Sequence, residues 1–133
     1  MSDAAKIWSL NYRVLLSVIS CAEHEICSLG LESKELFLLA EIDEHPYPAE
    51  LATTLNMPKA TVTAYLKRLE AAGFVRREID PADLRRHRLL LTASGRRAAA
   101  GGMSAVSGEF DKRLERLTAT QQKELKNLLE KII

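Results

Sequence analysis

The stretch PKATVTAYLKRLEAAG, from Pro58 to Gly73, constrains the fold more than any other part of the chain. Pro58 suits the first turn of a helix, where its missing N–H costs nothing, and Gly73 suits the left-handed residue just past a helix end. Between these two residues, four apolar side chains recur at helical spacing and predict one buried face: Val62, Tyr65, Leu66 and Leu69. The stretch therefore predicts an amphipathic helix.

The opposite face of this helix carries only small, hydroxyl and cationic side chains: Lys59, Ala60, Thr61, Thr63, Ala64, Lys67 and Arg68. The one acid nearby, Glu70, lies toward the C-terminal end of the helix. Small residues allow close approach to a DNA major groove, while hydroxyls and cations can meet base edges and phosphates. An ordinary solvated face has a similar composition, so the rest of the chain must decide between the two interpretations.

The distribution of charge favours nucleic acid over the solvated face. The 133 residues carry a formal net charge of only +1, and 47% of them are hydrophobic, which is enough for a core and excludes a disordered chain. From Lys59 to Arg97, however, ten basic and four acidic residues give +6, so the remainder of the chain carries −5. A basic middle between acidic ends is typical of an electrostatic surface for DNA.

The cysteines and the N-terminus predict a cytoplasmic protein. Cys21 and Cys27 lie six residues apart on a predicted helix and cannot pair without unwinding it. The sequence MSDAAKIW lacks the basic start of a signal peptide. The uncharged apolar run from Val14 to Ala22 is shorter than the roughly 20 residues that a membrane span needs. We therefore expect no membrane partner.

Residues 4–29 form a long helical pattern that Gly30 ends, and two apolar stripes run along it. The stripes are Ile7, Leu10, Val14, Val18 and Cys21, and beside them Trp8, Tyr12, Leu15, Ile19, Ala22 and Ile26. A surface helix needs one apolar stripe, so two stripes predict packing against both its own domain and a partner chain. The alternative is the central helix of a monomer.

Two helices that precede the Pro58–Gly73 stretch complete a helix-turn-helix. The first spans residues 33–44 with Ser33 as its expected N-cap, and the sequence HPYP at residues 45–48 breaks it. A short helix follows from Ala49 to Leu55, and only two residues link it to the Pro58–Gly73 helix. Two helices joined by so short a link are typical of a helix-turn-helix, in which the second helix, here Pro58–Gly73, is the one that reads DNA.

A β-hairpin is expected directly after Gly73. Residues 74–79 and 88–92 are rich in β-branched and large apolar side chains, and the sequence DPAD at residues 80–83 is typical of a turn. The predicted tip, residues 80–87, is a polar and basic loop. Such a loop beside a reading helix is a wing that can enter the neighbouring minor groove.

The C-terminal part returns to a helical pattern at Ala93. Gly101 and Gly102 interrupt this pattern, which predicts either a kink or a close helix crossing. The sequence TATQ at residues 118–121 matches a capping box. The last helix carries five apolar residues, which leave an apolar end that needs a partner: Leu125, Leu128, Leu129, Ile132 and Ile133.

With these elements in order, the chain resembles MarR-type winged helix-turn-helix transcriptional regulators over nearly its whole length. The motifs that carry the resemblance are LEAAG at residues 69–73, DLR at 83–85 and LTASG at 91–95. The resemblance implies a mainly α fold with a small β-hairpin. It implies a winged helix-turn-helix over residues 33–95 and dimerisation helices over residues 1–32 and 96–133. It also implies a homodimer that binds a palindromic operator on double-stranded DNA, usually as a repressor released by a small molecule or by oxidation.

The same resemblance assigns roles to residues of the wing. The Asp83 carboxylate would orient the Arg85 guanidinium, which enters the minor groove. Arg86, on the same basic tip, is a further expected DNA contact. The chain departs from the family pattern at Leu84 and Ala64, where many members have arginine, and at Pro58, where a serine cap is more usual. Because Ala64 has no guanidinium, it cannot make the bidentate contact to guanine that an arginine at this position would make. The lysines and threonines of the helix are therefore the expected contacts.

An effector pocket is implied where the first, second and fifth helices meet the winged lobe. The aromatic and polar residues that the sequence offers for its lining are Trp8, Tyr12, Arg13 and His24. The same residues also suit a core or an interface.

Other chemistry finds less support in the sequence. Cys21, His24 and Cys27 are spaced three apart, which gives a partial metal-ligand set, and we expect no metal and no cofactor. Redox sensing by Cys21 or Cys27 stays an alternative signal. No phosphate-binding loop or nucleophile motif is present, so an enzyme is not expected. The alternative function is a winged-helix module for protein docking or DNA architecture without operator specificity.

Overall fold

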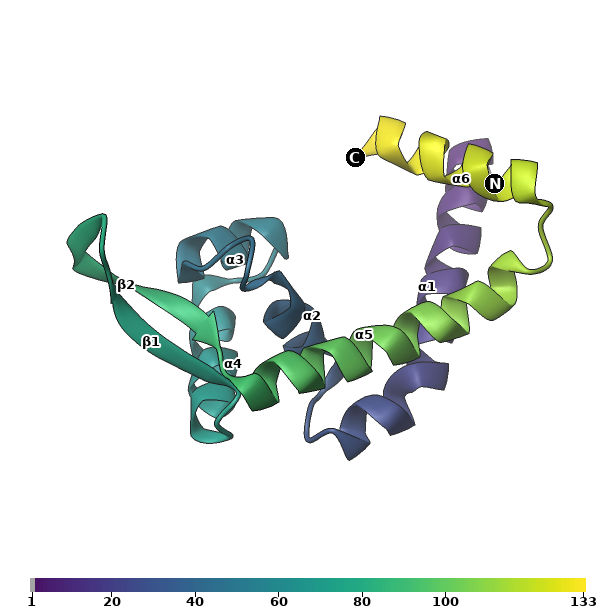
Figure 1. Cartoon of the computed structure of the whole chain (residues 1–133). Helices are drawn as coiled ribbons and strands as arrows, with labels where there is room; N and C mark the ends of the chain where they lie inside the picture. Colours follow the sequence, from purple (N-terminus) through teal and green to yellow (C-terminus); the bar gives the residue numbers. More distant parts are fainter. Residues whose placement is uncertain (1) are drawn as a thin grey trace.

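The computed structural model describes residues 2–133 as six helices and one hairpin. The elements are α1 (Asp3–Ser28), α2 (Ser33–Glu41), α3 (Pro48–Thr54), α4 (Lys59–Ala71), β1 (Val75–Asp80), β2 (Asp83–Leu91), α5 (Ala93–Leu114) and α6 (Ala119–Ile132). Figure 1 shows α5 running from the base of the hairpin to α6, with α2, α3 and α4 gathered at its N-terminal end. The predicted winged helix-turn-helix with flanking helices is confirmed.

The helix expected from Pro58 to Gly73 is present as α4, and its apolar face packs into the core. Val62, Leu66 and Leu69 are buried, and they join one cluster with residues of α1, α2, α5 and the hairpin. Pro58 is the N-cap rather than a first-turn residue, and no side chain caps this end. Gly73 has a φ of +79°, the left-handed conformation that was predicted for it.

The start and the end of α2 differ from the prediction. The N-cap is Glu32, not Ser33, because the side chain of Glu32 accepts from the backbone of Glu35 while Glu35 Oε1 accepts from the Glu32 N–H at 2.9 Å. This reciprocal pair satisfies two N–H groups that an α-helix leaves without partners. The helix ends at Glu41, three residues earlier than expected.

The hairpin has a shorter turn than the sequence predicted. β1 and β2 pair antiparallel from Val75 opposite Leu91 to Ile79 opposite His87. The register then shifts, so that Asp80 faces Asp83 and residues 84–86 bulge out of the ladder. The expected loop over residues 80–87 is therefore wrong, because Asp80 Oδ1 accepts from the Ala82 N–H at 2.8 Å and closes a tight turn.

A close junction joins the end of α4, the hairpin and the start of α5. The Thr92 N–H donates to the Phe74 carbonyl at 3.0 Å, and the Thr92 hydroxyl donates to the Gly73 carbonyl at 2.6 Å. Thr92 also caps α5, since its hydroxyl oxygen accepts from the Gly95 N–H. A Cβ at Gly95 would lie 1.9 Å from the Phe74 carbonyl oxygen, so only glycine fits there. The LEAAG and LTASG motifs are thus two sides of one contact.

The glycine pair in α5 marks a close crossing rather than a kink. α5 continues as one helix from Ala93 to Leu114. A Cβ at Gly102 would lie 2.4 Å from the Leu36 side chain, which is completely buried, and one at Gly101 would lie 3.3 Å from Leu29. The missing side chains therefore let α5 lie against α2 and the end of α1.

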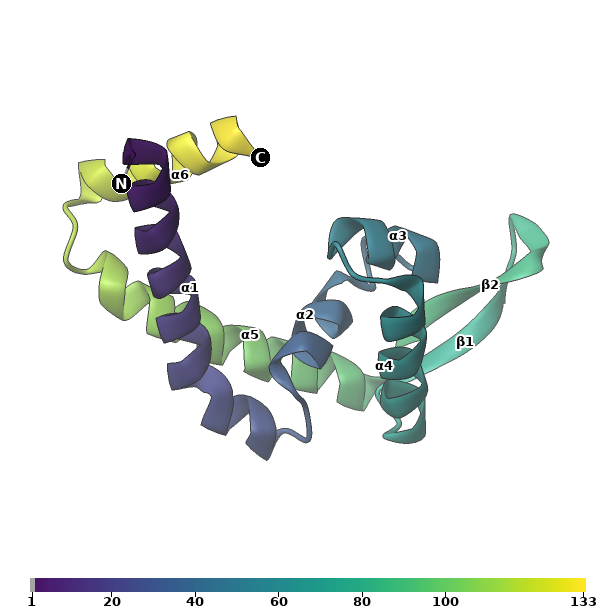
Figure 2. The ribbon, with the colours of Figure 1, turned by 180° about the vertical axis from the view of Figure 1, so that it is seen from behind.

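The two terminal helices leave much apolar surface open in the single chain. Of the two stripes on α1, only Val18, Ala22 and Ile26 are buried, while Cys21 is exposed. Exposed large apolar residues cover the first half of α1 and the end of α6: Ile7, Trp8, Leu10, Tyr12, Val14, Leu15, Leu16, Leu128, Leu129, Ile132 and Ile133. Figure 2 shows that α6 and the N-terminal half of α1 lie at the end of α5 that is remote from the hairpin. The capping box of α6, Thr118 with Gln121, is confirmed.

Two sequence predictions concern the membrane and the division of the chain into regions. Among residues 2–133, no single helix combines the length and the apolar character that crossing a membrane requires; α1 and α2 meet the length and composition test only as a pair bent by 82°. The division into residues 33–95 and the flanking regions stays a prediction, and α5 starts inside the former and ends in the latter.

We predict that Gly95→Ala lowers the free energy of unfolding by about 3 kcal/mol, because the new methyl group would overlap the Phe74 backbone. Gly108→Ala is the matched control in the same helix. A Cβ at Gly108 meets nothing within 4 Å, so this change should stabilise the chain by about 1 kcal/mol through helix propensity. Urea denaturation measures both. Equal effects of the two substitutions would contradict the close junction.

Candidate nucleic-acid interface

The outward face of α4 is open to solvent along its length. Lys59, Ala60, Thr63, Ala64 and Lys67 are exposed. Within residues 2–133, neither lysine on this face has a carboxylate within 4.0 Å, so their charges are not balanced inside the chain.

The two threonines on this face differ in exposure and in hydrogen bonding. The Thr63 hydroxyl donates to the Lys59 carbonyl at 3.0 Å, which leaves its oxygen lone pairs as acceptors. Thr61 is half-buried at the edge of the face. The helix N-terminus beside them lacks a side-chain cap, which leaves backbone N–H groups available to an anion.

Arg68 differs from the two lysines of this face because acidic residues hold it. Its guanidinium lies 3.2 Å from Glu32 Oε1 and 3.4 Å from Glu35 Oε1, and the Glu35 side chain is only 3% exposed. The hydrogen bond to Glu32 and the charge of Glu35 raise the pKa of Arg68. The side chain therefore ties the last turn of α4 to the first turn of α2, a role that the helical pattern alone did not reveal.

The wing tip presents one cation far from the body of the chain. The Arg85 side chain is 91% exposed. The Asp83 carboxylate accepts from the Arg85 backbone N–H at 3.0 Å and from its Nε at 3.2 Å. This is the contact that the resemblance implied for the pair. Leu84, between them, is also highly exposed.

Arg86, whose side chain is 53% exposed, is held at the root of the tip by contacts within the chain. Its Nε donates to Asp80 Oδ2 at 3.2 Å, and its guanidinium carbon lies 3.6 Å from the centre of the Tyr47 ring. The Tyr47 hydroxyl donates to the same Asp80 oxygen, and the Asp80 side chain is only 4% exposed. We call these three residues the wing anchor. They come from two segments 33 residues apart, so no local pattern could have predicted them.

The other arginines of the basic segment are mostly paired with acids. Arg88 donates two hydrogen bonds to Glu78 across the hairpin, at 3.0 and 2.7 Å. The remaining pairs are Arg76 with Glu78, Arg77 with Glu70, and Arg96 with Asp43. Most arginines that contribute to the net charge of +6 are therefore paired with acids. Within residues 2–133, the two lysines of α4, Lys59 and Lys67, have no such partner.

The four residues predicted to line an effector pocket are not brought together. Arg13 lines a hollow of about 550 Å³ between α1, α5 and α6, at the far end of α5 from the wing. Trp8 and Tyr12 stack on each other with ring centres 5.5 Å apart, and His24 is exposed. The residues that line the hollow are Leu10, Arg13, Val14, Ser17, Phe110, Arg113, Leu114, Arg116, Leu117 and Leu125. Its position differs from the one implied by the resemblance.

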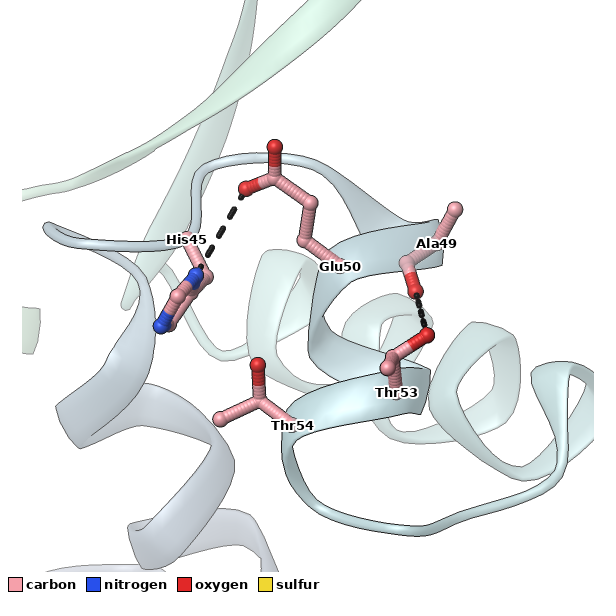
Figure 3. Close-up of a pocket in the computed structure, with 5 residues that line it drawn as sticks. All are labelled: His45, Ala49, Glu50, Thr53 and Thr54. Atoms are coloured by element: carbon pink, nitrogen blue, oxygen red, sulfur yellow. Dashed lines mark hydrogen bonds and ion pairs between the residues drawn. The ribbon is translucent and has the colours of Figure 1, made fainter.

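A second hollow of about 500 Å³ lies between the end of α2 and α3. Figure 3 shows His45 turned toward the Glu50 carboxylate, 3.7 Å away, and the Thr53 hydroxyl bound to the Ala49 carbonyl. His45, Glu50 and Thr53 on this wall thus have partners within the chain.

A group of possible metal ligands lies beside this hollow. The ligand atoms of Glu41, Glu44 and His45 lie within 4.8 Å of one another. These three side chains lie close enough together to share a metal ion. Glu44 is exposed and the other two are half-exposed, and exposed acidic groups often cluster in this way without binding a metal. Cys21, His24 and Cys27, the set considered from the sequence, do not belong to this group.

We predict that Asp80→Asn destabilises the chain at pH 7 and that the difference narrows as the pH falls from about 4 to about 2. The Tyr47 hydroxyl, the Ala82 N–H and Arg86 lower the pKa of Asp80 to about 2. A depressed folded-state pKa stabilises the fold above the unfolded-state pKa, and this contribution is lost as the carboxylate is protonated. Urea midpoints across this pH range measure the effect. A difference that does not change with pH would contradict it.

Comparison with known proteins agrees with this architecture. The MarR family model matches residues 29–86. The HTH-type transcriptional repressor Rv2887 of Mycobacterium tuberculosis is 32% identical over 134 residues, which cover 99% of this chain and 96% of that protein.

Two solved structures extend the likeness to three dimensions. The transcriptional repressor CouR bound to a 23-mer DNA duplex gives a TM-score of 0.75 at 28% identity, covering 92% of this chain and 89% of that one. The Rv2887 protein in complex with p-aminosalicylic acid gives 0.74 at 31% identity, covering 93% and 95%. Together with the helix-turn-helix and the wing, these matches show that the chain belongs to the MarR family of transcriptional regulators.

Proposed function

We propose that this regulator is a repressor that binds a palindromic operator as a homodimer and is released by a signal. The observation that carries the proposal is the surface formed by α4 and the wing. Unpaired lysines and hydroxyls lie on the helix face, and a single cation, Arg85, extends from the tip. The likeness to a repressor bound to a DNA duplex supports this use of the surface.

In the proposed complex, α4 lies in a major groove. Ala60 and Ala64 allow the helix to approach the bases, and Thr61 and Thr63 offer hydroxyls to base edges. Lys59 and Lys67 bind phosphates and set the position of the helix. Arg85 enters the adjacent minor groove, where negative potential favours a guanidinium.

The homodimer is proposed from the apolar surfaces of α1 and α6. These exposed residues, Ile7 to Leu16 on α1 and Leu128 to Ile133 on α6, exceed the scattered apolar residues that a monomer tolerates. A symmetric pair of chains would present two copies of α4, and a two-fold axis in the protein matches a palindrome in the DNA.

A small anion is the proposed releasing signal. The hollow between α1, α5 and α6 combines apolar walls with three guanidinium side chains, those of Arg13, Arg113 and Arg116. A relative binds p-aminosalicylic acid, an acid whose anion such groups could hold. Oxidation is the alternative signal, because Cys21 and Cys27 are free and exposed, and the Arg113 guanidinium lies 3.6 Å from Cys21 Sγ.

The first test is selection of bound sites from random duplex DNA, followed by titration of the selected site. We predict that Arg85→Ala weakens binding by about tenfold or more, as expected when an arginine in a groove is lost. Leu84→Ala is the matched control at the neighbouring tip position and should change the affinity little. Equal losses would contradict the role of Arg85.

The same titration separates the proposal from its alternative. A steep fall of affinity with salt is expected because several lysines and arginines replace counterions on phosphates. No measurable affinity at low salt would favour the protein-docking module instead.

A further inference from the structure

We propose that Tyr47 and Arg86 are positioning residues, which hold the wing tip in the direction that brings Arg85 to the minor groove. This inference rests on the proposed function, because it concerns how the same DNA surface is set up. It assigns to Arg86 a partner inside the chain in place of the DNA contact that the sequence predicted.

The need for an anchor follows from the register of the hairpin. Residues 84–86 have no partners on β1, so the ladder gives no support at the place where Arg85 projects. Side chains must therefore fix the tip. The wing anchor does so through Asp80 at the end of β1 and through Arg86, the last residue of the unpaired stretch.

The anchor is attached to a rigid part of the reading unit. Tyr47 is the N-cap residue of α3, the first helix of the helix-turn-helix. One residue earlier, the Pro46 carbonyl accepts from the Leu89 N–H of β2 at 2.8 Å. The strand that carries Arg85 is thus bound to the segment before α3 at two points, which fixes the wing relative to α4.

The two contacts of Arg86 support each other. Its Nε binds Asp80, which the Tyr47 hydroxyl also binds, while its flat guanidinium covers the Tyr47 ring at 3.6 Å. A guanidinium suits this place because it can donate in its plane and stack on an aromatic face at once. The charge is therefore used within the chain, and Arg85 is left as the tip cation that faces outward.

The test combines amide exchange in the free protein with binding to the selected duplex. Tyr47→Leu and Arg86→Met should speed exchange of the tip amides of Ala82 and Arg85 severalfold more than that of the core amides, whose exchange reports any loss of global stability. Tyr47→Phe keeps the ring under Arg86 and should give an intermediate increase. Arg76→Met, which removes another exposed hairpin arginine, is the control and should leave tip exchange unchanged. Unchanged exchange in both anchor variants would overturn the proposal, whether or not the protein binds DNA.

Binding then separates positioning from direct contact. Each anchor variant should weaken binding by about tenfold, since ordering a long tip side chain on binding costs up to this much. In an Arg85→Ala background the same variants should cause no further loss, because they act through Arg85. If Arg86→Met still weakens binding there and lowers the salt slope by about 1, Arg86 contacts a phosphate and the proposal is wrong. If the wild-type protein selects no site, the proposed function fails, and the exchange result alone decides on the anchor.

Discussion

The close contact between Phe74 and Gly95 is the constraint on which the rest of the structure depends. At this point the end of α4, the start of the hairpin and the first turn of α5 are joined by two hydrogen bonds, from the Thr92 N–H to the Phe74 carbonyl and from the Thr92 hydroxyl to the Gly73 carbonyl. Three directions are set together: that of the reading helix, that of the wing, and that of the long helix leading to the terminal helices. A shift at this junction would move all three elements, which is why glycine stands where a methyl group would meet a carbonyl oxygen.

The basic side chains fall into two groups, those paired with acids of the chain and those without such a partner among residues 2–133. Most arginines of the basic segment bind acids of the chain and hold elements together, as Arg68 does between α4 and α2 and Arg88 does across the hairpin. The lysines of α4 have no such partners in the part of the chain that the structure describes. Planar guanidinium groups suit fixed bidentate contacts, while ammonium groups suit a mobile approach to phosphates. The surface that we propose to contact DNA is therefore smaller than the count of basic residues indicates.

The sequence predicted those parts of the fold that local patterns determine. The buried face of α4, the left-handed Gly73 and the capping box at Thr118 each depend on residues close together in the chain. The pairing of Asp83 with Arg85 was implied by the family resemblance. The wing anchor was missed because it depends on Tyr47 meeting Asp80 across 33 residues. The register shift was missed because the tight turn closed by Asp80 and Ala82 leaves residues 84–86 out of the ladder. The effector pocket implied by the resemblance stays a prediction, and of its four expected lining residues only Arg13 lines the hollow between α1, α5 and α6. The hollow that holds Arg13 forms only where α6 folds back toward α1, and no local pattern fixes that angle.

Groove-resolved footprinting on a selected duplex tests most directly whether α4 and the wing form one DNA-binding surface. Dimethyl sulfate reports the guanine N7 position in the major groove, and hydroxyl radicals report the minor groove. The account predicts major-groove protection from α4 flanked by minor-groove protection from the wing, with only the latter lost in Arg85→Ala. Protection confined to the phosphate backbone, or loss of both patterns together in Arg85→Ala, would contradict it.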